Sequence, residues 1–102
     1  MIDTKQLKHA AKAAGFKVAR IADDGKALML HGAQEPWNPR TDNGQAFELA
    51  MLVDITVRRF DPYVYAIGKT QHKARFDNAD DMMAAAREAV FMASVEIGKA
   101  MK

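Results

Sequence analysis

The sequence has no cysteine, so no disulfide can stabilise the fold and no thiolate can act as a nucleophile or a metal ligand. Serine occurs once, at Ser94 within an expected helix, and no Gly-x-Ser-x-Gly, Walker or dinucleotide-binding fingerprint is present. The residues of the common catalytic motifs are therefore missing. We expect a protein that is not an enzyme and that uses no cofactor.

Long apolar runs are also absent, and no stretch approaches the length of a membrane span. The polar residues that follow Met1 lack the apolar segment of a signal peptide. We therefore expect no membrane association and, given the lack of cysteine, a cytoplasmic location.

Neither the net charge of the chain nor the positions of its histidines predict a ligand. Fifteen basic residues oppose thirteen acidic ones, and a net charge of +2 gives no strong field. The three histidines lack the spacing of a metal motif, and His31 with Glu35 and Asp42 is the one grouping that could supply several ligands if the fold brought them together. We predict no metal site.

The residues that are present suit one globular domain. With 102 residues, 49% hydrophobic and 27% charged, the chain can form one core but not two, so residues 1–102 are expected to be a single domain.

Three segments have helical spacing and recognisable ends. The first is expected to begin at Asp3, with a capping box to Gln6, and to end at Gly15. The second follows a capping box formed by Asp42 and Gln45, and the third starts at Asn78 and runs almost to the end of the chain.

The segments between these helices have the patterns of strands. Residues 16–31 predict a hairpin that turns at Asp23, Asp24 and Gly25, and residues 55–76 predict two or three further strands. The apolar run from Ala27 to Leu30 favours a strand with helices on both sides of the sheet. The predicted class is α+β in the order α-β-β-α-β-β-(β)-α, with an antiparallel-rich sheet covered by helices.

The run from Trp37 to Leu49, W-N-P-R-T-D-N-G-Q-A-F-E-L, resembles a motif of small bacteriophage and prophage proteins, the phage ABA-sandwich domain family with its NinX-like relatives. The alanine-rich last helix is similar to the end of that family's domain, so the resemblance covers about half of the chain. It implies a sheet between helical layers and a phage or prophage origin, but no reaction. Where the family often has acidic and aliphatic residues, this chain has Arg40, Asn43 and Gln45.

The loop around Trp37 is the first candidate binding site. Trp37 lies between Pro36 and Pro39, and a rigid aromatic of this kind suits stacking on a base or filling a partner's pocket, with Arg40 beside it. The structural interpretation is that Trp37 belongs to the core and that its neighbours start the following helix.

The predicted strands of residues 55–76 are the second candidate. They combine basic and aromatic side chains, as a nucleic-acid platform does: Arg58, Arg59, Tyr63, Tyr65, Lys73 and Arg75. The alternative is an ordinary solvated face with tyrosines that favour strands.

The last helix is rich in apolar residues, among them Met82, Met83, Met92 and Met101. Either it is the main core element, or its apolar width beyond what a monomer needs marks a homodimer or partner interface. Taken together, the sequence favours a phage-encoded accessory protein that acts by binding a host or phage protein, for example to inhibit a host defence system. A nucleic-acid-binding module on strands 55–76 is the alternative.

Overall fold

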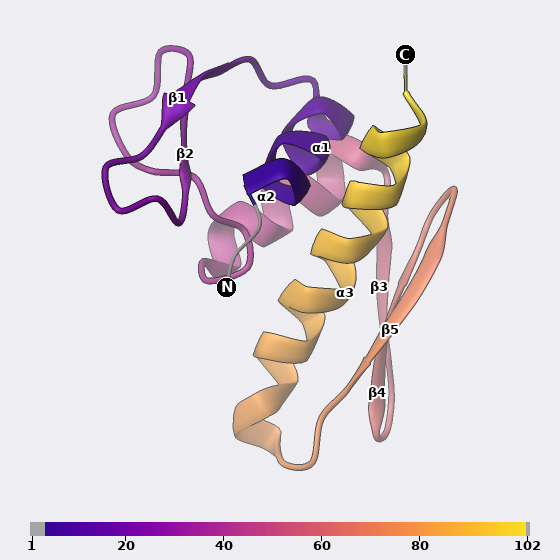
Figure 1. The fold of residues 1–102 in the computed structure, drawn as a ribbon. Helices are drawn as coiled ribbons and strands as arrows, with labels where there is room; N and C mark the ends of the chain where they lie inside the picture. Colours follow the sequence, from indigo (N-terminus) through magenta and orange to yellow (C-terminus); the bar gives the residue numbers. More distant parts are fainter. Residues whose placement is uncertain (1–3, 102) are drawn as a thin grey trace.

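Helices and antiparallel strands alternate along residues 4–101, which are the residues that the structure, a computed structural model, describes (Figure 1). The elements are α1 (Thr4–Ala14), β1 (Val18–Ile21), β2 (Leu28–Leu30), α2 (Asn43–Val53), β3 (Thr56–Phe60), β4 (Tyr63–Ile67), β5 (Gln71–Arg75) and α3 (Ala79–Ala100). This is the predicted order with the optional strand present, and the predicted α+β class is confirmed.

The described strands form two sheets rather than one. The hairpin β1–β2 is a small sheet of its own, and β3, β4 and β5 form an antiparallel meander in sequence order. The strand containing Leu28 is paired with β1 on one edge and bridged to Trp37 on the other. The Leu28 side chain lies in the main core with Trp37 and with Leu7 of α1, and α1 is the described helix with the most contacts to this hairpin. The apolar run is buried at Ala27 and Leu28 and half-buried at Met29 and Leu30.

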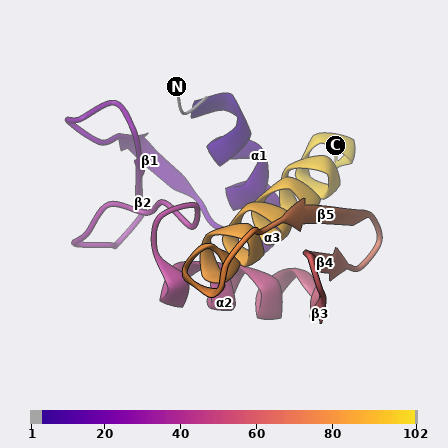
Figure 2. The same cartoon turned by 90° about the horizontal axis from the view of Figure 1, so that it is seen from below.

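Helix α3 is the central element. It packs on β4 and β5 through one side, while α1 and α2 pack on other parts of its surface (Figures 1 and 2). Phe91 of α3 is fully buried in the main core, together with Leu7 of α1 and Leu49 of α2. The larger sheet therefore has one face against α3, and the described helices leave its other face uncovered.

The closest helix packing occurs where α1 crosses the end of α3. A Cβ atom built on Gly98 would lie 1.7 Å from the carbonyl oxygen of His9, so the backbones meet at a distance that only glycine permits. This contact fixes α1 against α3 near the carboxyl end of the chain.

The predicted start signals of the second and third helices are confirmed. The Asp42 carboxylate accepts a hydrogen bond from the Gln45 amide at 2.9 Å, and the Asn78 side chain accepts one from the Asp81 amide at 3.2 Å. The Gln45 side chain does not complete the capping box, because its amide group bonds to the Pro36 carbonyl and the Asn38 backbone instead. The capping prediction at Asp3 lies outside the described residues.

Within residues 4–101, none of the helices has the length and apolar character that crossing a membrane requires. That includes α3, whose 22 residues carry several charges.

Candidate functional site

The uncovered face of the larger sheet collects aromatic and basic side chains. Because successive residues of a strand point to opposite faces, the burial of Val64 and Ala66 against α3 directs Tyr63 and Tyr65 of β4 to the opposite side. The strand register places Arg58 opposite Tyr65 and Tyr65 opposite Lys73, and it places Phe60, Tyr63 and Arg75 in the next row. We call these six residues the outer face: Arg58, Phe60, Tyr63, Tyr65, Lys73 and Arg75.

The three aromatic rings of the outer face form one contiguous group. Phe60 and Tyr65 meet edge to face with centroids 6.0 Å apart, and Tyr63 and Tyr65 meet at 6.3 Å. These are favoured geometries for aromatic pairs, and they explain why both tyrosines are half-buried although no described helix covers them. A hollow of about 420 Å³ lies beside the rings, lined by Phe60, Tyr63, Tyr65, the β3–β4 turn and Gln71.

Two cations lie over these rings. The Lys73 ammonium is 4.5 Å from the centroid of Tyr63, and the Arg58 guanidinium is 4.8 Å from that of Phe60. No described carboxylate pairs with Arg58, in contrast to Arg20, Arg40, Arg59 and Arg75. The middle row, Arg58, Tyr65 and Lys73, therefore presents two uncompensated positive charges on either side of an aromatic ring.

The end of the outer face near the β3–β4 turn is closer to neutral. Arg75 donates to Asp77 at 3.2 Å, and hydrogen bonds to Asp77 and then to Tyr63 raise the pKa of the guanidinium. In the turn itself, the hydrogen bond from Arg59 lowers the pKa of the Asp61 carboxyl. Arg75 is thus partly neutralised, and the positive potential is concentrated on the middle row.

Arg59 lies away from the other candidate residues of the sheet. It is adjacent to Arg58 in β3 and therefore points to the opposite face, where its guanidinium lies over the Phe76 ring at 5.5 Å and pairs with Asp61 at 2.5 Å. The structure brings Arg58, Tyr63, Lys73 and Arg75 together and excludes Arg59 from that group.

Trp37 is part of the main core, as the structural interpretation of its loop expected. Its side chain is 3% exposed, its backbone pairs with Leu28, and its ring meets Phe16 edge to face at 5.7 Å. The Asn38 side chain bonds to the Lys26 carbonyl and accepts from the Arg40 amide, which holds the loop against the hairpin. In this structure Trp37 offers no ring surface to a partner.

Arg40 is also engaged within the molecule. Its guanidinium pairs with Glu88 of α3 at 3.1 Å and lies 5.3 Å from the centroid of the Phe91 ring. The side chain is 28% exposed, so it connects the Trp37 loop to α3 and leaves little area for a ligand.

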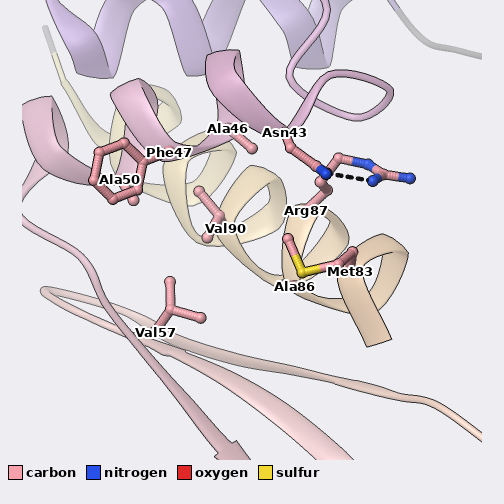
Figure 3. Close-up of a pocket in the computed structure, with 9 residues that line it drawn as sticks. All are labelled: Asn43, Ala46, Phe47, Ala50, Val57, Met83, Ala86, Arg87 and Val90. Carbon is pink, nitrogen blue, oxygen red and sulfur yellow. Dashed lines mark hydrogen bonds between the residues drawn. The ribbon is translucent and has the colours of Figure 1, made fainter. Parts of the chain in front are cut away.

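A second surface was not found by sequence reasoning. An apolar pocket of about 150 Å³ opens between α2, α3 and β3 (Figure 3). Its lining comprises Asn43, Ala46, Phe47, Ala50, Val57, Met83, Ala86, Arg87 and Val90. Phe47 and Met51, one turn apart on α2, are 70% and 67% exposed. The signal in the sequence is that this helix has apolar residues at these two positions as well as on its buried side.

The outer face also has a member, Phe60, that was not predicted as a site residue. Phe60 follows Arg58 at a spacing of two residues in a predicted strand, so it shares the face with Arg58. Tyr65, which belongs to the second candidate predicted from the sequence, occupies the middle of the face.

The other predicted features give no further site in the described part of the chain. No group of three or more potential metal ligands occurs among residues 4–101. Ser94 is fully buried and its hydroxyl donates to the Val90 carbonyl. Most of the apolar surface of α3 is covered by its own chain, and a homodimer through this helix stays a prediction.

Comparison of the chain with protein-family models, with curated proteins and with solved structures finds no match. The resemblance to the phage ABA-sandwich family therefore stays a prediction from the Trp37–Leu49 motif.

Proposed function

We propose that this protein is a non-enzymatic binding module whose outer face takes single-stranded nucleic acid. The observation that carries the proposal is the row of Arg58, Tyr65 and Lys73 across three strands, with Phe60 and Tyr63 beside it. Aromatic rings on an open sheet, alternating with cations, are the arrangement on which unpaired bases stack while the charges contact phosphates.

The chemistry of this face favours unpaired bases over a duplex. Stacking on Tyr65 or Phe60 needs a base whose face is free, which a duplex does not offer. The cations are placed for phosphate contacts, which carry no sequence information. We therefore expect binding of DNA or RNA single strands with little sequence preference.

A protein partner is the second candidate, and the exposed apolar residues of α2 around the pocket favour it. Under either candidate, the resemblance of the Trp37–Leu49 motif supports the role of a phage or prophage accessory protein in the bacterial cytoplasm. Inhibition of a host defence system by binding one of its components is one such role.

The test uses fluorescence anisotropy with labelled oligonucleotides of about 12 nucleotides, DNA and RNA, at about 50 mM salt. The double variant Arg58→Gln, Lys73→Gln removes the cations of the middle row. The matched control, Lys26→Gln, Lys99→Gln, removes the same charge from exposed positions off the outer face. We expect the first to weaken binding by about tenfold or more, since each lost phosphate contact lowers affinity, and the second to change it little.

Failure of the unmodified protein to bind either oligonucleotide at low salt would remove the nucleic-acid function. Equal losses of oligonucleotide affinity in the two double variants would show that binding depends on the net charge of the protein and not on the residues of the outer face.

A further inference from the structure

The apolar pocket has the dimensions of a site for one bulky side chain. Its volume of about 150 Å³ matches cavities that hold a benzene-sized ring. Ala46, Ala50 and Ala86 leave the space open, and the larger side chains of Phe47, Met83 and Val57 surround it (Figure 3). A helix laid in a groove needs several anchor positions in line, whereas this pocket accepts a single one.

A strand edge borders the pocket. β3 is at the edge of its sheet, and among the described residues it pairs with β4 alone. Val57 contributes to the pocket from this strand, and all five residues of β3 are exposed. An exposed edge presents unpaired N–H and C=O groups, which an added strand can satisfy.

A cation without a described carboxylate partner lies at the rim of the pocket. Arg87 donates through Nε to the Arg40 carbonyl at 2.8 Å and through Nη1 to Asn43 at 2.5 Å, both neutral acceptors. Arg87 and Arg58 are the two arginines for which residues 4–101 supply no ion pair, although the other four each have one. The charge at the rim is thus available to a carboxylate of a ligand.

We propose that β3 and this pocket together bind an extended acidic segment of another protein by strand addition. One bulky apolar side chain of the segment fills the pocket, and a carboxylate two residues away, on the same face of the added strand, pairs with Arg87. Main-chain hydrogen bonds to β3 supply the remaining affinity.

Charge argues against a second copy as the occupant. Centred antiparallel pairing of two β3 strands sets the Arg58 side chains of the two copies opposite each other, and like charges at that spacing are destabilising. An acidic segment brings no arginine opposite Arg58, and its carboxylates lie on the other face of the strand, beside Arg87. The proposed contact uses the edge of β3 and the face toward α2, so it is independent of nucleic-acid binding on the outer face.

The probe is the labelled synthetic peptide Ser-Thr-Glu-Thr-Phe-Thr-Glu-Thr-Ser, in which phenylalanine and both glutamates share one face of an extended strand. Its affinity for the full chain is measured by fluorescence anisotropy. We expect saturable binding. The affinity should fall by about tenfold when alanine replaces the phenylalanine, and it should also fall when glutamine replaces both glutamates.

On the protein, Met83→Glu places a negative charge at the pocket, and Met101→Glu makes the same change at the far end of α3. Both methionines are similarly exposed, at 46% and 44%, so neither change disturbs a buried position. We expect the first variant to lose about tenfold in peptide affinity and the second to retain it, while both keep the oligonucleotide affinity of the parent.

Strand addition is tested separately with two N-methylated peptides. One is methylated at the glutamates and phenylalanine and the other at the intervening threonines, because alternate amides of a strand point to opposite edges. We expect one form to lose binding and the other to keep it. The same result for both forms, no binding of the parent peptide, or equal effects of Met83→Glu and Met101→Glu would overturn the proposal.

Discussion

At the scale of single residues, the structure gives Trp37 a role in the packing of the core. Replacing it with alanine removes a buried indole and its contact with Phe16, so we expect Trp37→Ala to lower the free energy of unfolding by roughly 3–5 kcal/mol. Trp37→Phe should lower the free energy of unfolding much less. The buried indole N–H has no hydrogen-bond partner in the described structure, so removing it breaks no hydrogen bond. Urea denaturation measures both values. A folded Trp37→Ala variant of parental stability would contradict the assignment of this ring to the core.

Asp61 gives a pH dependence whose sign follows from its partner. The hydrogen bond from Arg59 lowers the pKa of the Asp61 carboxyl in the folded state, so the stabilisation is present above the carboxyl's unfolded pKa. It is lost as the pH falls through the lower, folded pKa. The contribution to stability is small because the pair is exposed.

The midpoint for Asp61 is best measured by carboxyl NMR titration. We expect Arg59→Gln to raise it toward the ordinary value for aspartate. An unchanged midpoint would show that the ion pair does not form in solution.

Residue-scale prediction from the sequence worked where the chemistry is local. Asp42 and Asn78 were assigned as helix caps from their position alone, since an N-cap depends on neighbours a few residues away. The sequence left open whether Trp37 is exposed, because that depends on Phe16 and Leu28, which are distant in the chain. Arg58 and Arg59 are neighbours in a predicted strand, and successive side chains of a strand point to opposite faces. The sequence therefore already implied that only one of the two arginines lies on the aromatic face.

At the scale of elements, the contact between α1 and α3 depends on Gly98. Alanine normally favours a helix over glycine by about 1 kcal/mol, but here its Cβ would overlap the His9 carbonyl. We expect Gly98→Ala to destabilise the fold by about 3 kcal/mol, since two backbones rather than flexible side chains must separate.

The control for this prediction is Ala84→Gly at an exposed position of the same helix, which should cost only the helix propensity, about 1 kcal/mol. Thermal or urea unfolding compares the two variants. If Gly98→Ala were as stable as the parent, the close approach of α1 to α3 would be wrong.

The predicted elements are confirmed in type and order, but their assembly into sheets was not predictable. Alternation in residues 55–76 indicates strands, yet the division of the described strands into two sheets goes with tertiary contacts: α3 packs on β4 and β5, and α1 contacts β1 and β2. The pocket between α2, α3 and β3 is likewise a product of tertiary packing. The sequence does not distinguish Phe47 and Met51 from the buried apolar residues of α2. In the structure both are exposed, and Phe47 lines the pocket.

At the scale of the whole molecule, the larger sheet separates two surfaces of different chemistry. The outer face is aromatic and basic, and the pocket on the side of α2 and α3 is apolar with a single cation at its rim. Because neighbouring residues of β3 point to opposite faces, one strand contributes to both surfaces, Arg58 to the first and Val57 to the second. A nucleic-acid ligand and a protein ligand can therefore be tested with variants that affect one surface at a time.

The salt dependence of oligonucleotide binding tests the central claim most directly. If Arg58, Lys73 and Arg75 contact about three phosphates, affinity for a single strand should fall roughly 20-fold between about 50 and 200 mM salt. In the Arg58→Gln, Lys73→Gln variant, the slope of log affinity against log salt should drop to about a third of the parental value. A parental slope near zero, or an unchanged slope in the double variant, would contradict nucleic-acid binding by the outer face.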